Sequence, residues 1–353
     1  MSSISKMIKV CSAAFSRDGL CVATGTAAGQ VSVYRGGESW RTMRGQHGDA
    51  VRHVAWSPDG SLVASSGGWD KTINLWNVTT QRRVQIIGNS EDGHTIRVVG
   101  IAWSPDGQSL VSGGLGKLGG SLKIWSLDGT LLRKLDVASV YSVVFSPNSK
   151  IIACGGFTDI VCLWMLDYDI PTISQLGDGI HNGSTMTCVK FSPDSNYIAS
   201  KTDVGVAGVG VVKIWSIESK ELIFTTTHGT KITSSLIFSR DSKYIVYGCS
   251  RTIYVCDFGN GKCRTITMPN MNPCIALNIG ENTLVSCNGI REVTCISTHD
   301  TPIQSRERIY ALFCALKCNK SNPHREVYQL GQHGGGPLAH ILELVAWWEI
   351  GFM

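Results

Sequence analysis

Residues 46–80 read QHGDAVRHVAWSPDGSLVASSGGWDKTINLWNVTT, and this stretch contains the unit from which the chain is built. Val51–Trp56 alternates apolar and polar residues, which is the pattern of a half-buried strand. Ser57–Gly60 then supplies the proline and glycine of a tight turn. Two more strands are predicted at Leu62–Ser66 and Thr72–Trp76, joined by a second turn that contains Gly-Gly-Trp-Asp. A sheet this small leaves one face apolar, so it needs copies of itself as neighbours.

The same turn recurs along the chain at a nearly constant spacing. An aromatic residue precedes each copy, and successive aromatics are 41, 47, 42, 46 and 47 residues apart by subtraction of their positions. These aromatics are Phe15, Trp56, Trp103, Phe145, Phe191 and Phe238. A third strand that ends in an aromatic residue follows the first five copies, and a degenerate seventh copy is predicted over residues 274–297. A fixed period of this length indicates a repeat architecture.

With this period and these tryptophans, the chain resembles the WD-repeat β-propeller family over residues 7–308, and that family has repeats of about 40–45 residues. The resemblance implies an all-β fold, a seven-bladed β-propeller of four-stranded antiparallel blades that occupies residues 1–308. Few residues precede the first strand, so we expect Pro302–Arg308 to close the ring, or the ring to be weakly closed. Residues 309–353 are expected to form a short irregular or helical C-terminal tail. A fold alone does not specify a function.

In this family, a histidine, a serine or threonine, an aspartate and a tryptophan form a hydrogen-bonded chain within a blade. The residues that match it best are His47, Ser65, Asp70 and Trp76. Such a chain is needed because a buried imidazole, hydroxyl or indole N–H is costly without a partner. A His-Ser-Asp trio also suggests a hydrolase. Because the spacing here follows the repeat and no nucleophile elbow is present, we expect a structural role.

The other repeats match this pattern only in part. The third has a histidine, a serine and a tryptophan but no obvious aspartate, the fourth has no histidine, and the sixth has neither the aspartate nor the tryptophan. The fifth has a full set in which the histidine is displaced by one residue. The side chains concerned are His94, Ser112 and Trp125 in the third repeat, Asp159 and Trp164 in the fourth, and His181, Ser200, Asp203 and Trp215 in the fifth.

Composition excludes several classes of protein. The net charge is +5 and the basic residues are scattered, which argues against a nucleic-acid groove. The 13 cysteines are also scattered, and many of them alternate within strands, such as Cys154 and Cys256. We interpret them as reduced thiols of a cytoplasmic protein, without excluding the nucleus. The N-terminus lacks the apolar core of a secretory signal, and no run of 18 apolar residues predicts a membrane span.

Two local motifs resemble ligand sites but do not fit them. Gly114–Gly119 matches the dinucleotide glycine pattern, yet a strand and not a helix follows it, so we expect a flexible hairpin loop. Cys314 and Cys318 lie near two histidines without the usual zinc spacing. We therefore expect no cofactor and no metal. The apolar end, residues 340–353, is interpreted as a folded-back or poorly ordered tail, as sequence from outside the gene, or as a helix that docks on a membrane surface or partner.

The most informative surface is one rim of the ring, where the resemblance places the start of each inner strand and the turn after each second strand. Trp69 lies in a glycine-flanked turn that has no local core to require it. Exposed tryptophan, tyrosine and arginine are enriched at binding hot spots. The competing interpretation is a Trp69 packed on the neighbouring loop. The predicted partner-binding residues are Lys9, Arg52, Trp69, Arg97, Tyr141, Thr158, Thr187, Thr202 and Met271.

The sequence therefore predicts a non-enzymatic scaffold that holds a protein or peptide partner on its rim, as a monomer or as a subunit of a larger complex. The alternative is a propeller enzyme or small-ligand binder that uses the central channel. That alternative requires several histidine or carboxylate side chains on the inner strands, and the sequence offers few. A nucleic-acid binder is disfavoured by the modest charge.

Overall fold

The computed structural model describes residues 10–17, 21–35, 38–115, 120–137, 139–156, 160–166, 172–176, 186–202, 210–228, 236–239, 241–249, 252–267, 273–278, 283–288 and 292–297. Within these residues the chain forms 27 strands and no helix, so the all-β prediction is confirmed. The candidate tail, residues 309–353, and the predicted closing strand, Pro302–Arg308, lie outside the described residues. No helix in the described part is long and apolar enough to cross a membrane.

Six sheets have four antiparallel strands each, in chain order, and we refer to them as blades one to six. Blade one contains β1 (Val10–Phe15), β2 (Cys21–Thr26), β3 (Val31–Arg35) and β4 (Glu38–Thr42). Blade two contains β5 (Val51–Trp56), β6 (Leu62–Gly67), β7 (Ile73–Asn77) and β8 (Arg83–Ile87). Blade three contains β9 (Val98–Trp103), β10 (Ser109–Gly114), β11 (Gly120–Ser126) and β12 (Leu131–Val137). Blade four contains β13 (Val140–Phe145), β14 (Ile151–Gly156), β15 (Val161–Met165) and β16 (Thr172–Leu176).

The remaining strands continue the same order. Blade five contains β17 (Met186–Phe191), β18 (Tyr197–Thr202), β19 (Gly210–Ser216) and β20 (Leu222–His228). Blade six contains β21 (Ile237–Phe238), β22 (Tyr244–Cys249), β23 (Thr252–Asp257) and β24 (Cys263–Thr267). A further sheet of three described strands contains β25 (Pro273–Asn278), β26 (Thr283–Asn288) and β27 (Glu292–Ser297). This sheet is the one that the degenerate seventh copy predicts.

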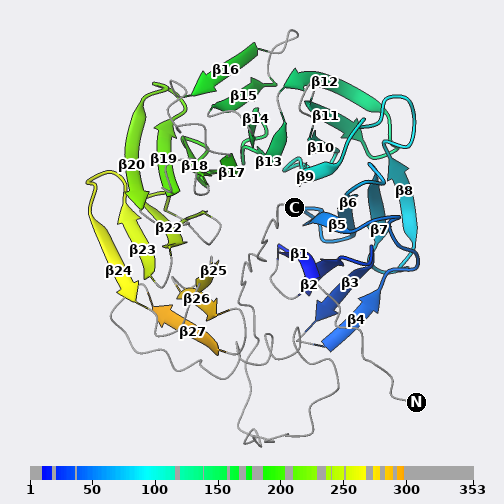
Figure 1. Cartoon of the computed structure of the whole chain (residues 1–353), viewed down its shortest axis with the longest axis horizontal. Helices are drawn as coiled ribbons and strands as arrows, with labels where there is room; N and C mark the ends of the chain where they lie inside the picture. The colour runs from blue at the N-terminus through cyan, green and yellow to red at the C-terminus, as the bar shows by residue number, and fades with distance from the viewer. Residues whose placement is uncertain are drawn as a thin grey trace, which may run out of the picture.

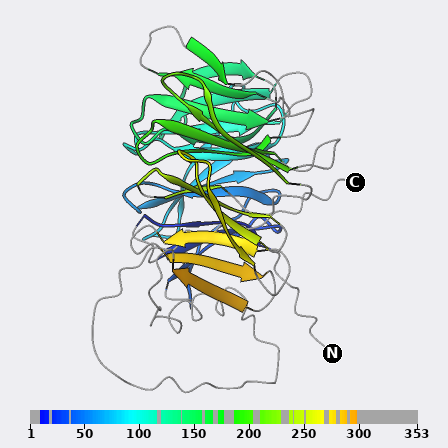
Figure 2. The same ribbon diagram turned by 90° about the vertical axis from the view of Figure 1, so that its left-hand side faces the viewer.

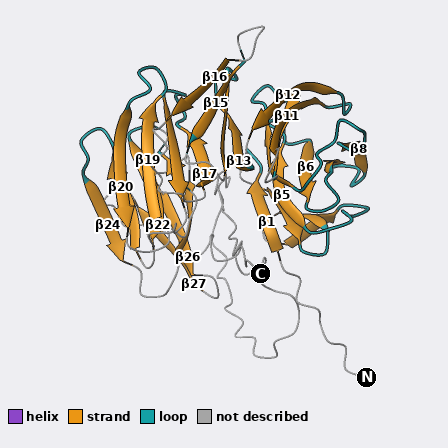
Figure 3. Cartoon of the chain, turned by 45° about the horizontal axis from the view of Figure 1, so that its top comes forward, coloured by secondary structure: helices purple, strands orange, loops and turns teal. Residues whose placement is uncertain are grey.

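The sheets follow one another around a common centre, with the first strand of each innermost and the fourth outermost (Figure 1). Seen from the side, the strands run between the two faces of this arrangement (Figure 2). The tilted view in Figure 3 shows strands joined by loops throughout the described chain. The four-stranded antiparallel blades of the predicted propeller are therefore present. The Gly114–Gly119 motif is followed by the strand β11, which pairs antiparallel with β10, and not by the helix that a dinucleotide-binding motif requires; residues 116–119 themselves lie outside the described residues.

The recurring turn is stable because its own side chains satisfy its backbone. In blade two, the hydroxyl of Ser57 donates to Oδ1 of Asp59 across 2.6 Å, and the amide of Ser61 donates to the same oxygen across 3.1 Å. Gly60 takes a φ of 73°, which a residue with a side chain rarely adopts. The hydrogen bonds from Ser57, followed by those from Ser61, hold the pKa of Asp59 below its usual range. The equivalent Ser104–Asp106 pair repeats the arrangement in blade three.

The aromatic residues before these turns fasten each blade to the preceding one. The indole Nε1 of Trp56 donates to the carbonyl oxygen of Ala14 in blade one, 2.9 Å away. In the next blade, Nε1 of Trp103 donates to the carbonyl oxygen of Ala55 across 3.1 Å. The apolar part of each ring packs into the core between the two blades. The periodic aromatics thus form interblade contacts, which accounts for their recurrence with the repeat.

One expectation about the cysteines is wrong. Cys256 on β23 is joined to Cys263 on β24 by a disulfide, whereas the sequence suggested reduced thiols throughout. The two residues are direct partners in the register of these antiparallel strands. Because they are only seven positions apart across a tight turn, their pairing follows from the hairpin itself.

Candidate functional site

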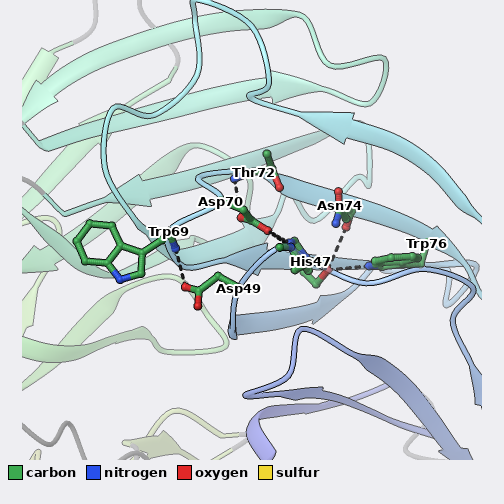
Figure 4. Close-up of polar contacts among 9 residues, drawn as sticks. His47, Asp49, Trp69, Asp70, Thr72, Asn74 and Trp76 are labelled. Carbon is green, nitrogen blue, oxygen red and sulfur yellow. Dashed lines mark hydrogen bonds and ion pairs between the residues drawn. The ribbon is translucent and has the colours of Figure 1, made fainter.

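The four predicted polar residues of blade two form a continuous hydrogen-bonded chain (Figure 4). Nε1 of Trp76 and Oγ of Ser65 are 2.7 Å apart, and so are Oγ of Ser65 and Nε2 of His47. Nδ1 of His47 lies 2.7 Å from Oδ2 of Asp70. One set of protons satisfies every group: the indole donates to the hydroxyl, the hydroxyl to Nε2, and Nδ1–H to the carboxylate.

This chain stabilises the blade and is not arranged for catalysis. Burial would raise the pKa of Asp70, but the hydrogen bond and charge of His47 and the amides of Thr72 and Gly48 bring it below its usual value. Asp70 therefore stays ionised and fixes the orientation of the histidine. Ser65 is fully buried, and its oxygen already accepts the indole N–H of Trp76. A serine nucleophile needs access to substrate, which Ser65 lacks.

Blade three contains the same chain with a different last member. His94 lies 2.7 Å from Oγ of Ser112, which accepts the indole N–H of Trp125 across 2.7 Å. On the other side of the ring, Nδ1 of His94 lies 3.1 Å from Oγ of Ser121. Ser121 thus takes the place of the aspartate that is missing from the third repeat. Burial, followed by the nearby charge of Lys123, lowers the pKa of His94 to about 3, so this histidine is neutral.

Blades four and five differ again. In blade four, the indole N–H of the buried Trp164 has no hydrogen-bond partner among the described residues, and Cys154 occupies the serine position. This agrees with the absence of a histidine from that repeat. In blade five, Ser200 and Trp215 are both buried, while the candidates His181 and Asp203 lie outside the described residues, as does Asp159 of blade four.

A polar chain that sequence reasoning missed joins His228, at the end of β20 in blade five, to Tyr247 and Cys256 of blade six. Nε2 of His228 lies 3.0 Å from the hydroxyl of Tyr247, which in turn lies 3.7 Å from Sγ of Cys256. Tyr247 also stacks on Tyr254 with ring centroids 5.2 Å apart. A tyrosine therefore replaces the serine, and the disulfide sulfur occupies the tryptophan position. The available signal was the dipeptide His228-Gly229, which repeats the His47-Gly48 of blade two.

Three of the predicted rim residues come together on neighbouring blades, and we refer to Trp69, Arg97 and Tyr141 as the rim patch. Trp69, in the turn between β6 and β7, is 57% exposed. The Cζ atom of Arg97, just before β9, lies over its ring, 3.9 Å from the centroid. Burial raises the pKa of Tyr141 on β13, and the nearby charge of Arg97 opposes that shift. Trp69 is therefore not buried, whereas its packing on the neighbouring loop stays untested, because residues 116–119 of that loop lie outside the described residues.

The turn that carries Trp69 is held in place by the segment that precedes β5. The amide of Trp69 donates to Oδ2 of Asp49 across 2.7 Å, and the amide of Gly68 donates to the carbonyl of Ala50 across 3.0 Å. A Cβ atom on Gly68 would overlap the same carboxylate oxygen and lie 2.9 Å from Nε of Arg52. Figure 4 shows the indole of Trp69 pointing away from the buried His47–Trp76 chain. The ring is thus presented outward by a turn whose backbone is fixed.

The guanidinium of Arg97 forms no ion pair and no hydrogen bond with the residues that the structure describes. Asp49, in the segment before β5, accepts the amide N–H of Trp69. The exposed Glu91 and Asp92 precede Arg97 in the chain, and neither forms an ion pair with it. A cation stacked on an aromatic face in this way keeps its N–H donors available for another group.

The remaining rim candidates are less informative. Arg52 and Thr187 are half-buried. Thr202 is fully buried and accepts the amide of Val211 across 3.2 Å, so its prediction as a surface contact is wrong. It lies at the end of β18 with its side chain inside the blade. Lys9, Thr158 and Met271 lie outside the described residues.

The inner strands carry little ionisable chemistry. The innermost strand of each sheet contains no aspartate or glutamate among the described residues. These strands are β1, β5, β9, β13, β17, β21 and β25. Among the described residues of these inner strands, the one histidine is His53 on β5. Burial, followed by the charge of Lys190 on β17, lowers the pKa of His53 to about 4. Within the described residues, no three histidine, cysteine or carboxylate side chains are grouped closely enough to hold a metal ion.

Four-stranded antiparallel blades arranged around a common centre define a β-propeller. The buried hydrogen-bonded chains that end in Trp76 and Trp125 lie inside two of these blades. The family model of the WD domain, G-beta repeat, matches residues 37–77, 87–126, 129–165 and 179–216. The chain is a WD-repeat protein. The first match begins near β4 and ends with β7, so this sequence repeat combines the outer strand of one blade with three strands of the next.

Curated relatives support the same family. The rice (Oryza sativa subsp. japonica) small ribosomal subunit protein RACK1y is 28% identical over 51% of this chain and 54% of its own length. Protein FIZZY-RELATED 3 of Arabidopsis thaliana is 28% identical over 68% of this chain and 48% of its own length. Transcription initiation factor TFIID subunit 5 of Caenorhabditis elegans is 27% identical over 55% of this chain and 28% of its own length. The chain spans about half the length of the first two. WD-repeat proteins are generally interaction scaffolds, and these comparisons indicate no enzyme family.

Proposed function

We propose that this chain is a non-enzymatic scaffold that binds a protein or peptide partner through its rim, at the rim patch of Trp69, Arg97 and Tyr141. The observation that carries the proposal is the stack of Arg97 on Trp69, which leaves 57% of the tryptophan exposed. Tryptophan and arginine are the residue types most enriched at the centres of protein interfaces. The general behaviour of WD-repeat proteins supports the same role.

An exposed indole has a clear energetic use in binding. Burying apolar surface stabilises a complex by roughly 25 cal/mol per Å², and a tryptophan offers one of the largest such surfaces of any side chain. The turn that carries Trp69 is already fixed by Asp49 and Ala50. Little conformational entropy is therefore lost when a partner covers the ring, which favours affinity.

The test is capture of partners from a native lysate with the full chain as bait. Trp69→Ala should lose partners that the unaltered chain retains. The matched control is Leu132→Ala, since Leu132 on β12 is 53% exposed but is not part of the rim patch. If Trp69→Ala remains folded and retains every captured partner, the rim patch is not the binding site.

A further inference from the structure

We propose that the rim patch recognises a segment of the partner in which an aspartate or glutamate lies next to an apolar side chain. The carboxylate would bind Arg97 and the apolar side chain would cover Trp69. This inference rests on the proposed function, because it needs a protein partner at this rim, and it specifies the chemistry of that partner.

The guanidinium of Arg97 is the candidate anion-binding group of the rim patch. Arg97 is half-buried over the indole, and the described part of the chain supplies no carboxylate to it. A guanidinium stacked through its face keeps its N–H groups directed outward from its edge, where they match a carboxylate in a bidentate pair. Asp49, which accepts the amide of Trp69, forms no ion pair with Arg97. The charge of Arg97 is thus best complemented by a carboxylate from outside the chain.

The exposed ring of Trp69 lies next to Arg97 and offers a contact for an apolar side chain. The Cζ atom of Arg97 and the ring centroid of Trp69 are 3.9 Å apart. An extended peptide rises about 3.3 Å per residue, so a residue one or two positions from the carboxylate reaches the indole. More than half of Trp69 remains exposed beside Arg97, and an apolar side chain would remove that surface from water.

Tyr141 on β13 is the third member of the rim patch. Burial raises the pKa of its phenol, so it remains a neutral group near Arg97 at physiological pH. A neutral phenol does not repel a carboxylate and adds aromatic surface to the patch. The three residues come from blades two, three and four, so the patch follows the rim from blade to blade and suits an extended segment better than a compact one.

The experiment uses the full chain labelled with 5-fluorotryptophan, with the Trp69 resonance assigned from Trp69→Phe. Three synthetic octapeptides serve as probes, with Glu-Phe, Gln-Phe or Glu-Ser at their centres and otherwise identical glycine and serine residues. We expect the Glu-Phe peptide to shift the Trp69 resonance and to bind about tenfold or more tightly than either control peptide, as expected for a charge-assisted pair. Arg97→Gln should abolish the preference for Glu-Phe over Gln-Phe. Arg82→Gln, an exposed arginine outside the rim patch, should retain it.

Reversing the charge at position 97 gives a further test. Arg97→Glu should reject the Glu-Phe peptide and bind a Lys-Phe peptide instead. Equal binding of Glu-Phe and Gln-Phe to the unaltered chain, or an Arg97→Gln variant that is folded and keeps the preference, overturns the inference. If Trp69→Ala still loses its lysate partners in that case, the scaffold function stands and only the carboxylate chemistry is wrong.

Discussion

Trp76 donates its indole N–H to the hydroxyl of Ser65 across 2.7 Å, and this bond connects the largest buried side chain of blade two to the His47–Asp70 pair. Removing either residue leaves the rest of the chain with an unsatisfied buried group. A single contact therefore links core packing to the polar chain of the repeat.

Trp76→Ala should destabilise the protein by about 3–5 kcal/mol, because it creates a cavity and leaves Ser65 without its donor. Chemical denaturation measures this change. Trp69→Ala is the control, because its exposed ring should cost less than about 1 kcal/mol. A loss below about 1 kcal/mol for Trp76→Ala, the value of one hydrogen bond, would be incompatible with the buried chain described above.

Ser121→Ala should destabilise blade three by about 1–3 kcal/mol, since it leaves Nδ1 of the buried His94 without a partner. Ser126→Ala is a suitable control, because Ser126 ends the same strand and its hydroxyl bonds lie in an exposed turn. Denaturant titration of both variants compares their losses of stability, and Ser121→Ala should lose more than Ser126→Ala. Equal small losses would show that Ser121 does not replace the aspartate.

The stability of the fold should decrease as pH falls below about 6.5. The folded pKa of His94 is lowered to about 3 from an ordinary value of 6.5. Its contribution is therefore complete above 6.5 and is lost as pH falls toward 3, because the unfolded chain binds the proton first. Each such histidine adds a slope of about 1.4 kcal/mol per pH unit in that window, and His53 behaves in the same way, with a pKa lowered to about 4.

Urea denaturation from pH 7 to pH 4.5 measures this slope. His94→Gln, which retains hydrogen-bonding capacity, should reduce it by about the share of one histidine, roughly 1.4 kcal/mol per pH unit. An unchanged slope in that variant would mean that His94 titrates normally in the folded protein.

Much of the fold follows from short sequence signals. The details that were missed or predicted wrongly depend on the register of strand pairing, which the sequence alone does not show. The Ser57–Asp59 turn and the interblade Trp56 are local features, so their recurrence predicts the blades. Ser121 lies 27 residues from His94 in the sequence, and only the pairing of β10 with β11 brings its hydroxyl to the imidazole of His94. Thr202 was predicted to lie in the turn after a second strand, but it is the last residue of β18 and is buried.

The polar chain of blade six shows the same limit in another form. The rule of histidine, serine, aspartate and tryptophan does not anticipate a tyrosine at the serine position, although His228 was visible in the sequence. Tyr247 takes the place of two groups, since its hydroxyl meets the histidine and its ring fills space in the core. The rim patch is an intermediate case: its residues were predicted individually, but the stacking of Arg97 on Trp69 is visible only in three dimensions.

Gly68→Ala should disturb the rim patch without unfolding the blade. The added Cβ would overlap the carboxylate of Asp49 that holds the amide of Trp69, so the turn must move and Trp69 must leave its position under Arg97. Partner capture should then fall to the level of Trp69→Ala, and the 5-fluorotryptophan resonance of Trp69 should shift in the free protein. Gly107→Ala is the control: its φ of 73° disfavours a side chain, whereas Gly68→Ala is disfavoured by overlap with Asp49, and the turn of Gly107 lies next to Pro58, away from the patch. That variant should lose about 1 kcal/mol or more of stability and keep its partners. If Gly68→Ala binds partners like the unaltered chain while its Trp69 resonance has moved, the fixed position of Trp69 does not determine binding.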